Sequence, residues 1–196
     1  MTAEENFFPK DLRLDFEPFH RHFTRYHTII GFLGKTGKGE SWLDCACGSG
    51  YGTTILSNYT NKITGYDISK GAVEYANKMY ANNNCHYTTD LQPLDNFDVI
   101  FSVETIEHMS RDNGVVFLKT LHSKLNKNGI MLITTPIPKQ TNNNPKNKFH
   151  IIEYSNLDFI DLLKESEFTV IDSFFVETTF TDGETKNQGY YKCKKT

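Results

Sequence analysis

The 196-residue chain lacks the features that mark several large protein classes. It has only four cysteines and no C-x-x-C pair, so neither a zinc knuckle nor a disulfide framework is indicated. No apolar run reaches the length of a signal peptide core or a membrane span, so we expect a cytoplasmic protein with no membrane partner. The formal net charge of −3 argues against a broadly basic nucleic-acid surface. This length suits a single domain over residues 1–196.

Two common nucleotide-binding patterns are also missing. G-x-G-x-x-G, counted from Gly48 and Gly50, would need its third glycine at Thr53, which disfavours NAD. G-x-x-x-x-G-K-[ST], ending at residues 34–36, would need its opening glycine at Ile29. The glycines therefore mark either a different cofactor site or a turn that binds nothing.

The most informative stretch covers residues 41–54, SWLDCACGSGYGTT. Its apolar start, its closely spaced glycines and the residues that follow predict a buried strand, a tight turn and the start of a helix. Gly48, Gly50 and Gly52 have no Cβ, so the backbone can approach a ligand closely, and the helix start offers free N–H groups. An anionic or hydroxyl-rich ligand is expected at this turn.

The pattern around this stretch is that of an α/β protein. Residues 1–18 are expected to form a loose arm, and residues 19–33 carry an apolar stripe at helical spacing. A strand is predicted to end at Asp67, followed by a helix capped by Ser69. Asp67 lies about 20 residues after the glycine turn, where nucleotide-binding folds place a carboxylate for ribose hydroxyls. Further strands are predicted at 85–90, ending in Asp90, and at 97–103.

The second half continues with a helix over 113–125, a stop at Asn128-Gly129 and a strand over 130–135 closed by Pro136. Residues 136–150 are rich in Pro and Asn, and we expect a substrate-side loop that delivers His150, with plain disorder as the alternative. A helix over 155–166, a strand over 168–178, a turn at 182–183 and a strand over 188–194 complete the chain.

Glu104, Glu107 and His108 form an E-x-x-E-H pattern after the strand at 97–103. Their i, i+3 and i+4 spacing puts all three side chains on one face of any helical turn that runs through them. Two carboxylates and an imidazole suit a divalent ion or a proton transfer, whereas a carboxylate that caps a helix or pairs with Arg111 is the alternative.

The order of these motifs resembles that of the class I S-adenosylmethionine (SAM) dependent methyltransferases across nearly the whole chain. Asp44, Ala46, Gly48 and Gly50 are similar to the family's first motif, D/E-x-G-x-G-x-G, with Ala46 in place of the first glycine. Alanine is tolerable there if the position needs a small residue rather than a positive φ. The resemblance implies a Rossmann-like α/β fold with a seven-stranded, mostly parallel sheet, a C-terminal antiparallel hairpin and helices on both faces.

The resemblance also assigns the cofactor contacts. Asp44 and the turn from Cys45 to Tyr51 would support the methionine end of SAM, and Arg25 its carboxylate, although a surface arginine is equally expected. Asp67 would bind the ribose. Asp90 and Leu91 would lie at the adenine, unless Asp90 is only a turn residue. The full set is Arg25, Asp44, Cys45, Ala46, Gly48, Tyr51, Asp67, Ile68, Asp90, Leu91 and Ser102.

The E-x-x-E-H pattern with a later His150 is similar to the metal-binding pattern of small-RNA 2′-O-methyltransferases and to a set in ubiquinone-type O-methyltransferases. Carried over, Glu104, Glu107, His108 and His150 would hold Mg or Mn. In related polysaccharide or small-molecule methyltransferases without an established metal, His150 would instead be the general base, with His108 and Glu104 as further catalytic candidates.

An N/D-P-P-Y motif, typical of N-methyltransferases, is absent. The expected function is therefore methyl transfer to a hydroxyl oxygen of a small molecule or saccharide. RNA 2′-O-methylation and non-catalytic SAM binding are the alternatives, and the acidic net charge weakens the RNA hypothesis.

Overall fold

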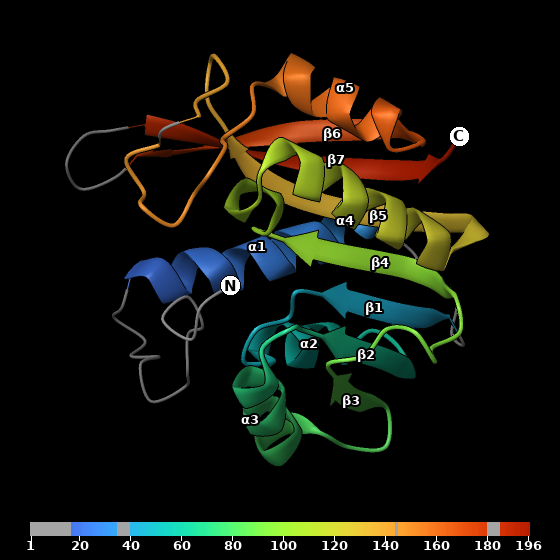
Figure 1. Ribbon diagram of the computed structural model, residues 1–196. Coiled ribbons are helices and arrows are strands. Elements are labelled where there is room, and N and C mark those ends of the chain that lie inside the picture. The colour runs from blue at the N-terminus through green and yellow to red at the C-terminus, as the bar shows by residue number, and fades with distance from the viewer. Residues whose placement is uncertain (1–16, 35–39, 144, 180–184) are drawn as a thin grey trace. The chain divides into compact units, whose positions relative to one another are not determined.

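The computed structural model describes residues 17–34, 40–143, 145–179 and 185–196 (Figure 1). The described residues belong to two compact units, Met1–Val103 and Glu104–Thr196. The first unit contains α1 (Glu17–Leu33), β1 (Ser41–Cys45), α2 (Tyr51–Leu56), β2 (Lys62–Tyr66), α3 (Lys70–Tyr80), β3 (Cys85–Thr88) and β4 (Phe97–Val103). The second contains the 3-10 helix η3 (Ile106–His108), α4 (Arg111–Lys124), β5 (Leu125–Ile137), α5 (Asn156–Glu165), β6 (Phe168–Thr179) and β7 (Thr185–Lys195). That residues 1–196 are one domain stays a prediction.

The strands form a seven-stranded sheet in the order β3-β2-β1-β4-β5-β7-β6. Within the first unit, β1 pairs in parallel with β2 and β4, and β2 pairs in parallel with β3. Within the second unit, β7 pairs antiparallel with both β5 and β6. The predicted mostly parallel sheet with a C-terminal antiparallel hairpin is confirmed.

The central strand β1 of the first unit is buried over Trp42–Cys45, as expected for a parallel strand covered on both faces. Cys45 lies opposite Tyr66 of β2, and Tyr66 lies opposite Thr88 of β3, so the three strands end at the same edge (Figure 1). Residues that follow these strands are therefore brought to one edge, which is where open α/β sheets bind ligands.

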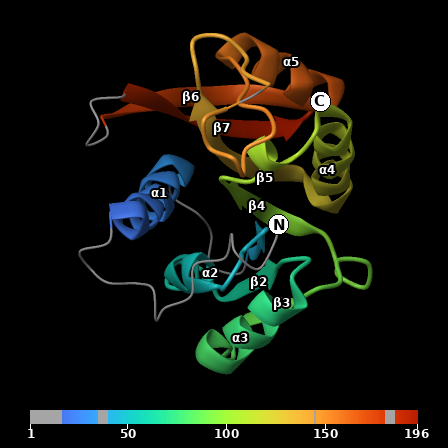
Figure 2. The ribbon, with the colours of Figure 1, turned by 60° about the vertical axis from the view of Figure 1, so that its left-hand side comes forward.

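The helices of the first unit begin close to their predicted positions. α1 begins at Glu17, so residues 17–18 of the predicted arm are helical, and residues 1–16 lie outside the described part of the chain. α3 begins after Ser69, whose hydroxyl accepts a hydrogen bond from the Ala72 N–H at 3.4 Å, which confirms the predicted cap. Figure 2 shows α3 beside β3, and these two elements contact each other.

The second unit corrects two predicted boundaries. α4 ends at Lys124, and β5 begins at the fully buried Leu125, whose extended ψ of 137° takes the chain into the strand before Asn128-Gly129 is reached. The predicted stop at Asn128-Gly129 is therefore wrong. β5 also runs on through Ile137, because Pro136 and Ile137 pair with β7, so the loop begins at 138 rather than 136. The predicted turn at 182–183 lies outside the described residues.

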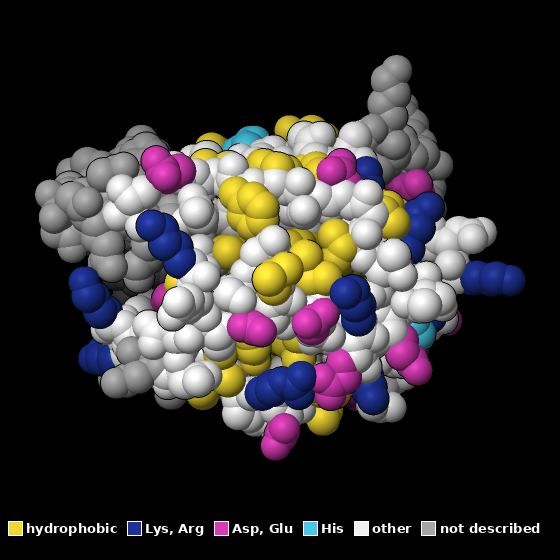
Figure 3. Space-filling model, turned by 90° about the horizontal axis from the view of Figure 1, so that it is seen from above, with side chains coloured by type: hydrophobic (Ala, Val, Ile, Leu, Met, Phe, Trp, Pro, Cys, Tyr) yellow, Lys and Arg dark blue, Asp and Glu magenta, His cyan; other side chains and the backbone are white. Residues whose placement is uncertain are grey.

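Some large apolar side chains are exposed in the second unit, including Leu157 of α5 and Ile171 and Phe175 of β6. Figure 3 shows a face on which apolar side chains gather near the middle, with acidic and basic ones around them. Among the helices of the described ranges, none has the length and apolar character needed to cross a membrane.

Candidate functional site

The acidic residue of the first motif, Asp44, is fully buried in β1. Its Oδ2 accepts a 2.7 Å hydrogen bond from the Thr53 hydroxyl, and the Tyr26 hydroxyl of α1 lies 3.4 Å from both carboxylate oxygens. Burial raises the pKa of Asp44 to about 7, although the hydrogen bonds from Thr53 and Tyr26 oppose this change. The carboxyl therefore links β1, α1 and α2 at the base of the glycine turn.

The turn that follows is left-handed at three positions: Ala46 (φ 66°), Gly48 (φ 53°) and Gly50 (φ 87°). Alanine was expected to be tolerable at position 46 only if the position did not need a positive φ. Ala46 does have a positive φ, so this condition is not met. An alanine in this region costs roughly 1–2 kcal/mol relative to its preferred conformations. Two backbone hydrogen bonds, from the N–H groups of Ala46 and Cys47 to the Tyr66 carbonyl, hold the turn in this shape.

Two of the glycines are needed by the protein's own packing. A Cβ added at Gly52 would lie 2.0 Å from Cζ of Tyr26, and one added at Gly50 would lie 2.6 Å from Cβ of Ala76. Gly52 therefore makes room for the Tyr26 ring rather than for a ligand. Gly48 differs, because its N–H donates a hydrogen bond to Asp67, the carboxylate predicted to bind the ribose.

Asp67 follows β2, as predicted, and is fully buried. One oxygen accepts a 2.9 Å hydrogen bond from the Gly48 N–H, and the other accepts a 2.8 Å hydrogen bond from the Ser69 N–H. Asp67 thus fixes the glycine turn and the start of α3. Each carboxylate oxygen has a second lone pair, so these bonds do not use up its capacity to accept ribose hydroxyls.

The other predicted SAM contacts differ in exposure. Ile68 is 66% exposed and leaves an apolar surface beside Asp67. Asp90 is exposed and accepts a 2.8 Å hydrogen bond from the Gln92 N–H, whereas Leu91 is buried. Ser102 is fully buried at the end of β4, and its hydroxyl has no hydrogen-bond partner among the described residues. Among these four residues, Ile68 and Asp90 are exposed to a ligand while Leu91 and Ser102 are buried, and their contact with SAM stays a prediction.

Of the remaining predicted SAM contacts, Cys45 is buried at the end of β1, and two others lie on helices of the first unit. Arg25 is half-buried on α1, one residue before Tyr26. Tyr51 is half-buried at the start of α2, and its ring meets the Tyr26 ring edge-on at 5.9 Å. Both lie next to Tyr26, the residue that contacts the Asp44 carboxylate.

Glu104 begins the second unit in the left-handed region, with φ 54°. Its Oε1 accepts hydrogen bonds from the Thr134 hydroxyl at 2.8 Å and from the Gln188 amide at 2.6 Å. The 3-10 helix begins only at Ile106, so no helical turn runs through Glu104 and the shared face that such a turn would give does not form. Glu104 is therefore directed to the antiparallel strands β5 and β7, while the next two members of the pattern are carried by η3.

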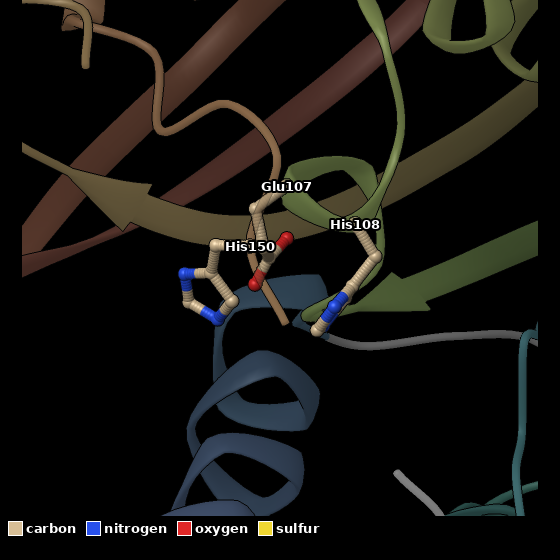
Figure 4. A group of neighbouring side chains, drawn as sticks. All are labelled: Glu107, His108 and His150. Atoms are coloured by element: carbon tan, nitrogen blue, oxygen red, sulfur yellow. The ribbon is translucent and has the colours of Figure 1, made fainter. Parts of the chain in front are cut away.

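Glu107, His108 and His150 form a compact cluster (Figure 4). One potential ligand atom from each lies within 4.8 Å of the others, and Figure 4 shows the Glu107 carboxylate with the two imidazole rings on either side. The rings are perpendicular, with centroids 5.0 Å apart. Among the described His, Cys, Asp and Glu side chains, the structure thus brings together three of the four predicted ligands, and Glu104 lies outside the group.

Hydrogen bonds determine which ring nitrogens are available. Nδ1 of His108 lies 2.9 Å from the Phe149 carbonyl oxygen, and Nδ1 of His150 lies 2.6 Å from Oε1 of Glu153. A carbonyl or carboxylate oxygen can only accept, so both Nδ1 atoms carry the proton. The neutral His150 ring then has its lone pair on Nε2, where it can accept a proton or bind a metal.

The backbone explains how His150 reaches His108 from a distant part of the chain. The carbonyl oxygen of Glu107 accepts hydrogen bonds from the N–H groups of Ile151 and Ile152, at 2.7 and 3.2 Å. This contact fixes the end of the 138–150 loop against η3. The predicted delivery of His150 by the loop therefore has a structural basis.

Several supporting residues were not identified from the sequence. Thr135 donates a 3.2 Å hydrogen bond to the buried Glu107 carboxylate, and Gln188 reaches Glu104 from a strand 84 residues later. Only Glu153 left a local signal, because it follows His150 in an H-x-x-E spacing. The alternative partner considered for the carboxylates, Arg111, pairs with Glu165 instead.

Residues 43–133 match the model of a methyltransferase domain family. The chain is 31% identical over 122 residues to a ubiquinone biosynthesis O-methyltransferase of Bradyrhizobium diazoefficiens, covering 59% of this chain and 46% of that protein. It is also 31% identical over 111 residues to a tRNA U34 carboxymethyltransferase of Alteromonas mediterranea, covering 50% of this chain and 33% of that protein. The chain thus spans a third to a half of the length of these curated relatives.

The fold agrees with these matches. A SAM-dependent methyltransferase of Leishmania major has a TM-score of 0.73 at 21% identity, covering 89% of this chain and 73% of that one. The sheet order, the glycine turn and the domain match are those expected of a class I SAM-dependent methyltransferase.

Proposed function

We propose that the chain transfers the methyl group of SAM to a hydroxyl oxygen of a small molecule or saccharide. The observation that carries this proposal is the ring of His150, whose Nδ1 proton is held by Glu153 so that the lone pair lies on Nε2. An oxygen acceptor must lose its proton, and a histidine with a free Nε2 is suited to take it.

The chemistry divides between cofactor and protein. SAM supplies a methyl group already activated by a sulfonium, so the protein needs to position the donor and acceptor and to remove one proton. His150 accepts the hydroxyl proton through Nε2 while the O–CH₃ bond forms and the C–S bond breaks, which releases S-adenosylhomocysteine. In this proposal the turn at Gly48 supports the methionine end of the cofactor, and Asp67 with Ile68 holds its ribose.

A divalent cation bound by Glu107, His108 and His150 is the second candidate for activating the hydroxyl. Two histidines and one carboxylate form a known ligand set with open positions, and the structure gathers them within 4.8 Å. The cation would bind the acceptor oxygen and lower the pKa of its hydroxyl. Mg or Mn is the proposed ion, and Glu104 is not among its ligands.

The first test is calorimetric binding of SAM and S-adenosylhomocysteine, with NAD as the control nucleotide. We expect SAM to bind and NAD not to. A folded protein that binds no SAM contradicts the proposal, and SAM binding without turnover on any acceptor supports a non-catalytic SAM-binding protein.

The second test measures methyl transfer from labelled SAM to catechols, sugars and short RNAs, with and without manganese. His150→Gln is expected to lower kcat by a factor of 10² to 10⁴ with SAM affinity unchanged. His86→Gln is the matched control, because His86 is an exposed histidine on β3 and should leave the rate unchanged. Labelling of RNA alone would replace the small-molecule proposal with the RNA alternative.

A further inference from the structure

We propose that Glu153 is a positioning residue that fixes the tautomer and the orientation of His150. This inference rests on the proposed function, in which His150 presents Nε2 to the acceptor or to a cation. Oε1 of Glu153 lies 2.6 Å from Nδ1 of His150, a distance typical of a charge-assisted hydrogen bond.

The pair is shielded from water. The side chains of His150 and Glu153 are only 12% and 5% exposed. In such a site a hydrogen bond competes little with solvent, and moving either group away would leave a buried polar group with one partner fewer. The pair is therefore a fixed element rather than a transient surface contact.

The backbone holds both members in register. Glu153 forms an isolated antiparallel bridge with Asn142, with N–H to O distances of 2.8 and 2.9 Å in the two directions. Between the two side chains, the N–H groups of Ile151 and Ile152 are held by the Glu107 carbonyl. Both ends of the pair are thus fixed independently of the hydrogen bond that joins them.

The chemistry of the acceptor determines the tautomer. A carboxylate has no proton to donate, so the neutral His150 ring must place its proton on Nδ1 and its lone pair on Nε2. An amide at the same position could offer either its oxygen or its NH₂ group, and the constraint would be lost while the shape was kept. His108 differs, because its Nδ1 is held by the Phe149 carbonyl rather than by a side chain.

The test is nitrogen NMR of the histidine rings in the full chain, at a pH high enough that the rings are neutral. We expect the Nδ1–H pattern for both His108 and His150 in the unaltered protein. In Glu153→Gln, His150 should show a mixture of tautomers or the Nε2–H form, while His108 keeps its pattern and serves as an internal control. A wild-type His150 in the Nε2–H form, or an unchanged His150 pattern in the folded variant, would overturn the proposal.

Kinetics supply the second readout. Glu153→Gln should lower kcat by about 10–100-fold, the usual effect of removing the partner of a functional histidine, with SAM affinity unchanged. Glu165→Gln is the control, because Glu165 is an exposed glutamate that pairs with Arg111. If the tautomer changes as expected but the unaltered protein methylates nothing, the proposed function fails and the positioning of His150 stands. If the unaltered protein is active and Glu153→Gln keeps the full rate, the role of Glu153 in the reaction fails and the proposed function stands.

Discussion

The Thr53 hydroxyl donates a 2.7 Å hydrogen bond to a carboxylate, Asp44, that is fully removed from water. Burial of a charged group is unfavourable, so the carboxyl of Asp44 holds its proton more tightly than an exposed one and its pKa rises from 3.8 to about 7. The hydroxyls of Thr53 and Tyr26 limit this rise because they stabilise the charged form. The first-motif acid is therefore a structural link between β1, α1 and α2 as well as a predicted cofactor contact.

The raised pKa of Asp44 predicts a pH-dependent stability. Between pH 3.8 and about pH 7 the folded protein keeps the Asp44 proton while the unfolded chain releases it. The stability that Asp44 contributes is therefore fully present below pH 3.8 and is lost as the pH rises through about 7. The loss amounts to at most roughly 4 kcal/mol, at 1.36 kcal/mol per pKa unit. Asp44→Asn cannot titrate, so the stability of the unaltered protein should fall relative to this variant as the pH rises.

Urea unfolding at about pH 5, 6, 7 and 8 measures this difference. Asp95→Asn is the control, because Asp95 is exposed. The stability of this variant should change with pH in the same way as that of the unaltered protein. A constant difference between the unaltered protein and Asp44→Asn across this range would show that Asp44 does not titrate as expected.

Gly52 predicts a large effect from a single methyl group. The Cβ of Gly52→Ala would lie 2.0 Å from the Tyr26 ring, so α1 or α2 must shift, and we expect a loss of about 1–3 kcal/mol in the free energy of unfolding. Gly71→Ala is the matched control, because a Cβ at Gly71 meets no atom within 4 Å and alanine favours the helix. Denaturant unfolding should show the two substitutions acting in opposite directions, and equal effects would contradict the packing argument.

Most of the fold could be predicted from the sequence because its signals are local. Apolar runs that end in a glycine turn, an aspartate or a glutamate predicted β1, β2 and β4, and Ser69 at the start of an amphipathic segment predicted the cap of α3. The boundaries of β5 could not be predicted, because its ends are decided by pairing with β7 and by the burial of Leu125. A turn signal such as Asn128-Gly129 does not outweigh these long-range contacts.

The candidate site was predictable in its residues but not in its geometry. The E-x-x-E-H spacing identified Glu107 and His108, and the loop identified His150, but Glu104 would share a face with them only if one helical turn ran through all three. That face does not form, because Thr134 and Gln188, 30 and 84 residues away in sequence, hold Glu104 at a positive φ. Such contacts leave no periodic signal in the chain.

Ala46 offers a test of stored backbone strain. Its φ of 66° is unfavourable for alanine and acceptable for glycine, the residue that the family motif has here. Ala46→Gly removes this cost of roughly 1–2 kcal/mol but loses about 0.4–1 kcal/mol through the greater freedom of the unfolded chain. Thermal and urea unfolding should therefore show a gain in stability of up to about 1.6 kcal/mol. A clear loss would mean that the Ala46 methyl group contributes packing that outweighs the strain.

The contact between Glu104 and Gln188 predicts an energetic coupling across the second unit. The Gln188 amide donates a 2.6 Å hydrogen bond to the Glu104 carboxylate, and Gln188 is only 6% exposed, so removing either partner leaves the other incompletely satisfied. A double-mutant cycle of Glu104→Ala and Gln188→Ala in urea should give a coupling energy of about 1–3 kcal/mol. Gln140, which is exposed in the loop, is the control partner and should show no coupling to Glu104. A coupling of zero to Gln188 would mean that Thr134 and the backbone, rather than Gln188, hold Glu104 at its positive φ.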